Sequence, residues 1–206
     1  MKRFRFTLIA VCLVLLYMGY GDLSLYLRNQ TPAEISIEQL IRQGPPQEWL
    51  HVTGGYLNLD EAISTSGSVE LDALLVPLTP EPEQERYEVL VETHDTQLLD
   101  LFKTYHFKLD TLYDKEAFRE ENARVFFSQR DITGMLQTSL IADNNLNQLK
   151  KLARAGGLDI PEEVFFLSEG KTPPFWRGFF FLAVALAGMA KVLFGWKKPS
   201  GDAGPK

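Results

Sequence analysis

The chain has 206 residues, 45% of them hydrophobic, and a formal net charge of −6 at pH 7. This length favours one folded domain, and a single cysteine, Cys12, excludes a disulfide framework. The acidic balance argues against a nucleic-acid partner, because neutralisation of phosphates by Lys and Arg dominates that binding.

The chain begins with a basic segment followed by an apolar one. Three of residues 1–5 are Lys or Arg, and residues 6–21 contain no charged side chain. A signal peptide is one interpretation of this pattern. Cleavage needs small residues after the apolar run, however, and Tyr17 and Tyr20 stand there instead. We therefore predict an uncleaved transmembrane helix over residues 6–28, preceded by a short tail.

Residues 30–172 form the predicted folded domain, and its periodicity indicates mixed α and β structure. Ser36 can cap a first helix that Gly44 ends, and Asp95 can cap a second. The predicted helices cover 36–44, 95–105, 114–122 and 144–157, and the predicted strands cover 48–59, 69–78, 86–93, 124–138 and 162–170.

Two of these strands carry finer expectations. In the strand 86–93, Tyr87, Val89 and Val91 should face the core, while the alternate residues, among them Leu90 and Glu92, face outward. The strand 124–138 should be interrupted near residues 129–131.

The order of these elements predicts the fold class. Five strands, with helices after the third strand and before the last, fit a small antiparallel β-barrel of the OB type with added helices. Gly54, Gly55 and Gly134 would permit the sharp coiling that such a barrel needs. The alternative is an open antiparallel sheet with helices on one face. We thus expect an α+β domain between two transmembrane helices.

A second transmembrane helix is predicted over residues 175–196. It ends in nineteen residues with one charge, Lys191, a length of roughly 28 Å that matches the hydrocarbon core of a bilayer. Trp176 and Trp196 stand near its two ends, where aromatic side chains prefer the membrane interface. The stem of Lys191 can carry its ammonium group toward the same interface.

The distribution of charge predicts the topology. Residues 22–172 contain 13 Lys and Arg and 26 Asp and Glu, a net charge of 13 − 26 = −13, whereas both ends of the chain are basic. Basic flanks stay in the cytoplasm, so we expect the tails 1–5 and 197–206 there and the domain outside. This arrangement suits a bacterial inner membrane protein with a periplasmic or extracellular domain.

The two predicted spans should pack against each other. Asp22 follows the uncharged part of the first span and Arg177 precedes that of the second, so opposite topology places the two charges at similar depth. We expect a forked ion pair between them. Ala183 and Ala187 offer a shallow helix face that Gly19 could approach closely.

Sequence motifs for catalysis are weak. Gly170-Lys171-Thr172 resembles the end of a phosphate-binding loop, but that loop needs a glycine where Phe165 stands. The three histidines, at positions 51, 94 and 106, have no metal-ligand spacing. We therefore predict no catalytic, cofactor-binding or metal-binding residue.

Two pairs of phenylalanines remain as candidates for contact with another protein. Each pair on a strand places one ring inward and one outward, so the outer rings either cover a second layer or form an exposed patch. The four residues are Phe126, Phe127, Phe165 and Phe166.

These features favour a non-enzymatic membrane protein, an accessory subunit or assembly factor of a membrane complex. Its expected partners are the lipid bilayer and another membrane protein. A membrane-tethered hydrolase with a carboxylate site and a ligand-binding sensor are the alternatives. The sequence does not determine the oligomeric state or the partner.

Overall fold

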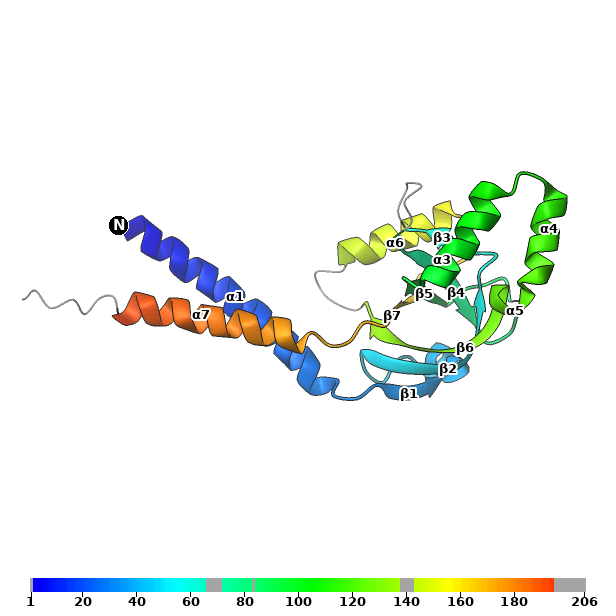
Figure 1. The fold of residues 1–206 in the computed structure, drawn as a ribbon. Coiled ribbons are helices and arrows are strands. Elements are labelled where there is room, and N and C mark those ends of the chain that lie inside the picture. Colours follow the sequence, from blue (N-terminus) through cyan, green and yellow to red (C-terminus); the bar gives the residue numbers. More distant parts are fainter. Residues whose placement is uncertain (1, 66–71, 83, 138–142, 195–206) are drawn as a thin grey trace, which may run out of the picture. The chain divides into compact units, whose positions relative to one another are not determined.

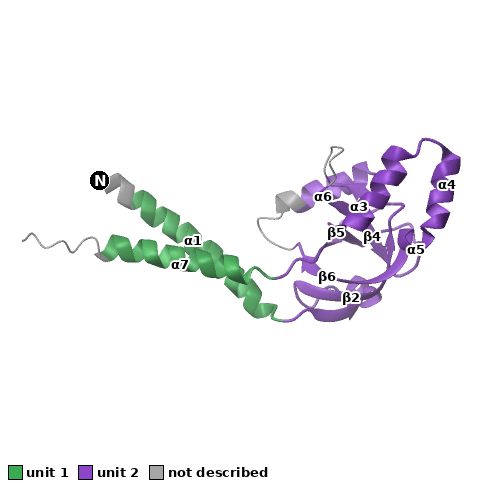
Figure 2. Ribbon diagram, in the orientation of Figure 1, with its two compact units in different colours: residues 1–30, 173–206 green, residues 31–172 purple. Residues whose placement is uncertain are grey.

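The protein falls into two compact units (Figure 2). One unit comprises residues 1–30 and 173–206, and the other comprises residues 31–172. The structure is a computed structural model that describes residues 2–65, 72–82, 84–137 and 143–194.

The first unit is a pair of helices, α1 (Lys2–Arg28) and α7 (Phe175–Phe194), which lie side by side (Figure 1). The segments Phe6–Arg28 and Phe175–Leu193 have mean hydropathies of 1.9 and 1.5 and are long and apolar enough to cross a membrane. The prediction of two helices with this length and composition is confirmed, and their membrane-spanning role stays a prediction. The compartment and the orientation stay predictions.

Small residues allow the two helices to pack closely. A Cβ atom at Gly19 would meet Leu182 and the carbonyl oxygen of Gly178, and one at Gly188 would meet the sulfur of Cys12. Early residues of α1 thus contact late residues of α7, so the helices run antiparallel. Glycines at such crossings bring the backbones together, which increases the dispersion contacts between helices.

The second unit contains a closed five-stranded β-barrel within a mixed α+β fold, and the open-sheet alternative is wrong. Around the barrel the order is β2, β6, β7, β5, β4 and back to β2, and every pairing is antiparallel except that of β5 with β7. The barrel strands are β2 (Trp49–Asn58), β4 (Leu74–Thr79), β5 (Val89–Thr93), β6 (Phe127–Leu136) and β7 (Phe165–Glu169).

Two short strands extend the barrel sheet. β1 (Ala33–Ser36) pairs in parallel with β2, and β3 (Ile63–Ser64) pairs antiparallel with β4. The register of β2 against β6 shifts between Val52 and Gly55, at the glycine pair where we expected a bend. Gly54 has φ 76°, a left-handed conformation that glycine adopts without strain.

Most helices of this unit lie between β5 and β6, the third and fourth strands of the barrel along the chain (Figure 1). The helices are α2 (Ile37–Gln43), α3 (Thr96–Lys103), the π-helix η1 (Thr104–Lys108), α4 (Leu112–Glu121), α5 (Ala123–Phe126) and α6 (Asp143–Ala155). The oxygens of Ser36 and Asp95 accept hydrogen bonds from the backbone at the starts of α2 and α3, as predicted.

Apolar side chains fill two regions of the domain. Residues that point into the barrel, such as Val89 and Val91, form the main core. A second cluster lies on the outer side of β4, β5 and β7, where α6 covers them, and includes Leu90 and Phe166. Leu90 therefore faces α6 and is fully buried, which corrects the expectation that it faces outward. Tyr87, expected to face the barrel core with Val89 and Val91, also belongs to this second cluster. A strand covered on both faces does not alternate between apolar and polar residues.

The strand predicted over 124–138 also differs from the structure. Its first residues form the short helix α5, and β6 then runs without interruption from Phe127 to Leu136. The polar residues 129–131, where a break was expected, pair regularly with β2 or flank its bulge. These side chains are polar because they are exposed or partly exposed to solvent, not because the strand ends there.

Candidate functional site

A partly buried polar cluster joins three strands at one end of the barrel. Glu92 comes from β5, Ser168 from β7, Gln137 from the residue after β6, and Lys171 from the segment after β7. Oε2 of Glu92 accepts hydrogen bonds from the Ser168 hydroxyl at 2.7 Å, from Gln137 at 3.1 Å and from Lys171 at 3.0 Å.

The cluster keeps Glu92 ionised. Burial alone raises the pKa of the Glu92 carboxyl, but hydrogen bonds from Ser168 and Lys171 and the charge of Lys171 outweigh burial. The pKa of Glu92 therefore lies below its ordinary value of 4.5. The Ser168 oxygen also accepts hydrogen bonds from Gln137 at 3.0 Å and from Lys171 at 3.2 Å.

A serine beside a lysine amine resembles the nucleophile and base of some hydrolases. Here the serine is unsuited to attack a substrate. Ser168 is only 1% exposed, and its hydroxyl already donates to Glu92. It is also absent from the lining of the adjacent pocket. We conclude that Ser168 and its partners hold the strands together.

The pocket beside this cluster is formed by α6 and the end of the barrel. Its volume is about 560 Å³. Polar and apolar side chains both face it, and Glu92 and Lys171 of the cluster contribute to its wall. Its lining residues are Thr65, Glu92, Gln137, Gln148, Leu149, Lys151, Leu152, Ala155 and Lys171.

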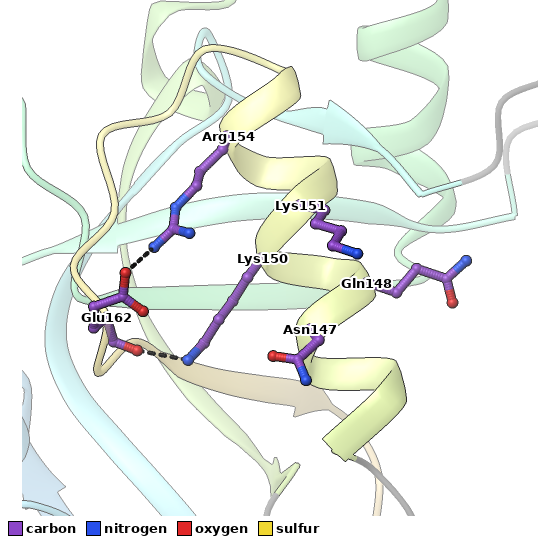
Figure 3. Close-up of a pocket in the computed structure, with 6 residues that line it drawn as sticks. All are labelled: Asn147, Gln148, Lys150, Lys151, Arg154 and Glu162. Carbon is purple, nitrogen blue, oxygen red and sulfur yellow. Dashed lines mark hydrogen bonds and ion pairs between the residues drawn. The ribbon is translucent and has the colours of Figure 1, made fainter.

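A second, more polar hollow of about 740 Å³ lies on the outer side of α6 (Figure 3). Glu162 is the partner of two cationic side chains in this hollow. Arg154 donates to its carboxylate at 3.0 Å, and Lys150 donates to its backbone carbonyl. Lys151 lines both hollows and in Figure 3 extends away from Glu162. Lys151 forms no ion pair with any residue that the structure describes.

Exposed apolar side chains gather on the helical segment between β5 and β6. In the described part of residues 31–172, the large apolar side chains that are exposed are Phe107 (55%), Leu112 (82%), Tyr113 (79%) and Phe127 (38%). Phe107 lies in the π-helix, one residue before its end, and Leu112 and Tyr113 begin α4. We call Phe107, Leu112 and Tyr113 the apolar tip.

The four phenylalanines predicted as contact residues are mostly internal. Phe126 and Phe166 are buried, and Phe165 packs against the barrel core from a partly buried position. Only Phe127 is exposed. Sequence reasoning missed the apolar tip, whose one signal was a pair of apolar residues placed directly before the charged helix 114–122.

Asp22 and Arg177 form a forked ion pair between α1 and α7. Nε of Arg177 donates to Oδ2 of Asp22 at 2.7 Å, and Nη2 donates to Oδ1 at 2.8 Å. The Asp22 side chain is 13% exposed and that of Arg177 is 61% exposed. Two parallel hydrogen bonds of this kind make an arginine–carboxylate pair stronger and more specific than a single contact does.

The other residues predicted for helix pairing are arranged differently. Gly19 does lie at the contact, but Ala183 and Ala187 are exposed on α7. The contact face of α7 instead carries Gly178 and Ala185, seven residues or two turns apart. The four-residue spacing of Ala183 and Ala187 identified small residues on α7. It did not predict which face of α7 turns toward α1.

The predicted interface residues are exposed where the structure describes them. Trp176 is 77% exposed at the start of α7, and Lys191 is exposed near its end. Trp196 lies outside the described residues. Exposure on an isolated chain is compatible with contact with lipid, and the role of these residues at a membrane interface stays a prediction.

Comparison with known proteins identifies no relative. Among protein-family models, curated proteins and solved structures, nothing matches the chain. Within the described residues, no group of three or more His, Cys, Asp or Glu side chains could hold a metal ion. Function must therefore be inferred from the polar cluster, the pocket beside it, the apolar tip and the helix pair.

We predict a pH-dependent effect of Glu92→Gln. The lowered pKa means that ionised Glu92 stabilises the fold fully above about pH 4.5, and that this stabilisation is lost as the pH falls through the folded-state pKa. At pH 7 the variant should lose about 1–3 kcal/mol of stability. Thermal unfolding measured from pH 7 to pH 3 should show that the difference in stability between the variant and wild type becomes smaller as the pH falls. Glu121→Gln, an exposed carboxylate on α4, controls for loss of one charge, and a gap of constant size for Glu92→Gln would contradict the prediction.

A second prediction concerns the ion pair between the helices. Asp22→Asn and Arg177→Gln, separately and together, should show a coupling of about 0.5–1 kcal/mol in a double-mutant cycle of thermal stability in detergent. The exchanged pair, Asp22→Arg with Arg177→Asp, should recover part of the loss because it restores opposite charges. Additive single effects without recovery would show that the pair contributes nothing.

Proposed function

We propose that the protein is a non-enzymatic, membrane-anchored accessory subunit or assembly factor of a membrane protein complex. Its barrel domain lies outside the cytoplasm and contacts another membrane protein through the apolar tip. The observation that carries this proposal is the concentration of exposed apolar side chains on one segment of an otherwise acidic domain.

The low burial of the two helices supports the membrane anchor. Only 11% of the most apolar window of each helix is buried, whereas the core helix of a soluble protein is mostly covered. The exposed side chains are large and apolar, as in Phe6, Tyr17 and Phe180. Lipid is the environment in which such surfaces are stable. Basic residues flank both helices, which supports our proposal that both flanking tails face the cytoplasm of a bacterial inner membrane protein.

The barrel is proposed to be of the OB type. Five strands close on themselves, and the helical segment from α3 to α5 stands between the third and fourth of them. This assignment does not imply oligonucleotide binding, because one fold serves many functions. The net charge of the domain also opposes binding to phosphates.

The composition of the apolar tip suits a protein partner. Leu112 and Tyr113 are about four-fifths exposed, so their burial against a partner would remove most of their apolar area from water. Tyrosine is enriched at such interfaces because it combines a large apolar ring with one polar group. Charged residues such as Lys108 and Asp114 border the tip and provide a polar rim.

A ligand-binding sensor is the second candidate, and the pocket beside Glu92 favours it. In the described residues, no observation favours the hydrolase with a carboxylate site. A serine hydrolase has no better support, since Ser168 is buried and already hydrogen-bonded. The sensor and the accessory subunit are compatible, because the pocket and the apolar tip use different residues.

We predict that Leu112→Ser with Tyr113→Ser disrupts the complex. Both side chains are exposed, so the domain should fold as before while co-purification of the membrane partner in mild detergent falls at least tenfold. Glu120→Ser with Glu121→Ser, two exposed residues on the same helix α4, should leave the complex intact.

Two results would refute this function. In one, the wild-type protein extracted from its native membrane in mild detergent co-purifies with no partner. In the other, a partner is retained equally by the tip variant and by the control variant.

A further inference from the structure

We propose that the pocket between α6 and the barrel binds a small hydroxycarboxylate, that is, an organic acid with one carboxylate and at least one hydroxyl group. This ligand goes beyond the accessory role proposed above, and the two can fail independently. The inference rests on the hydrogen-bonding groups that the pocket wall offers and on its charge.

Glu92 offers an unused acceptor. All three of its hydrogen bonds with described residues end on Oε2. Oε1 is not among the fully buried polar atoms that lack a partner, and Glu92 lines the pocket. The cluster thus fixes the carboxylate in place through one oxygen and leaves the other for a donor that enters the pocket.

The wall also carries positive charge that Glu92 does not balance. Two ammonium groups, of Lys151 and Lys171, face one carboxylate, so the lining residues that the structure describes carry a net charge of 2 − 1 = +1. This local excess is notable because residues 31–172 contain 12 Lys and Arg and 25 Asp and Glu, a net charge of 12 − 25 = −13. A monocarboxylate would neutralise the pocket and give Lys151 an ionic partner.

These two features define the class of ligand. A donor is needed for Glu92 and an anion for the two lysines. An amino acid would satisfy both, but its ammonium group would be repelled by Lys151 and Lys171. A hydroxyl group donates to Glu92 without that cost. The side-chain amides of Gln137 and Gln148 can bond further hydroxyls.

The size and the remaining wall are compatible with such a molecule. About 560 Å³ lies within the range of small-molecule sites, roughly 300–1,000 Å³. Leu149, Leu152 and Ala155 form an apolar side of the pocket against which the C–H face of a sugar acid could pack. Hydroxy acids from the size of lactate to that of a hexuronate therefore carry the groups that Glu92 and the two lysines can bind.

The proposal is tested by titration calorimetry of the full-length protein in detergent at pH 7. The probes are L-lactate, D-gluconate and D-glucuronate, and the comparators are acetate, which lacks the hydroxyl group, and D-glucose, which lacks the carboxylate. We expect at least one hydroxycarboxylate to bind with a Kd below about 10 mM, and at least tenfold more tightly than acetate and glucose.

Variants locate the binding. Lys151→Gln should weaken binding at least tenfold, because it removes a cation that forms no ion pair with the described residues. Lys150→Gln is the matched control, since Lys150 is the next residue on α6 but lines only the hollow of Figure 3, and it should change the Kd less than twofold. Thermal unfolding checks that both variants are folded. Failure of all three probes to bind, equal binding of acetate or glucose, or wild-type affinity of Lys151→Gln would overturn the proposal.

Discussion

One carboxylate oxygen, Oε2 of Glu92, connects three strands at the end of the barrel from which the chain leaves the domain. Its hydrogen bonds reach β7 through Ser168 and the segments after β6 and β7 through Gln137 and Lys171. Partial burial of a carboxylate is costly without such partners, so each donor offsets part of its desolvation. The parallel pairing of β5 with β7 closes the barrel beside it. The neighbouring pocket has a fixed wall because this interaction is satisfied within the protein.

The core, the pocket and the apolar tip occupy different parts of the domain. The barrel interior and the layer beneath α6 are apolar and provide stability. The pocket lies at the border of α6 and the barrel, whereas the apolar tip belongs to the helices inserted between β5 and β6. Insertions of this kind vary without disturbing the strands that carry them, which is why loops and inserted helices commonly hold binding residues. A contact through the tip and a ligand in the pocket can therefore be studied by separate substitutions.

Helix caps and the glycine bend were predicted correctly from local signals in the sequence, whereas the break expected at residues 129–131 was not found. The caps at Ser36 and Asp95 and the bend at Gly54 depend on neighbouring residues, and the structure confirms them. Features that depend on distant residues were missed or wrong. Leu90 is buried because α6, more than fifty residues later, covers its strand, and Ala183 faces away from α1 because rotation of α7 is set by Gly178 and Ala185. The polar cluster likewise combines residues that no sequence motif places together.

Labelling of single cysteines in intact spheroplasts tests directly whether the acidic domain is held outside the cytoplasm by two spans. In a Cys12→Ser background, a membrane-impermeant maleimide should label Glu81→Cys, an exposed position after β4, without permeabilisation. Ser200→Cys, in the basic C-terminal segment, should be labelled only after permeabilisation. Protection of position 81 together with labelling of position 200 in intact spheroplasts would reverse the topology. Recovery of the protein in the soluble fraction would show that the two helices do not anchor it.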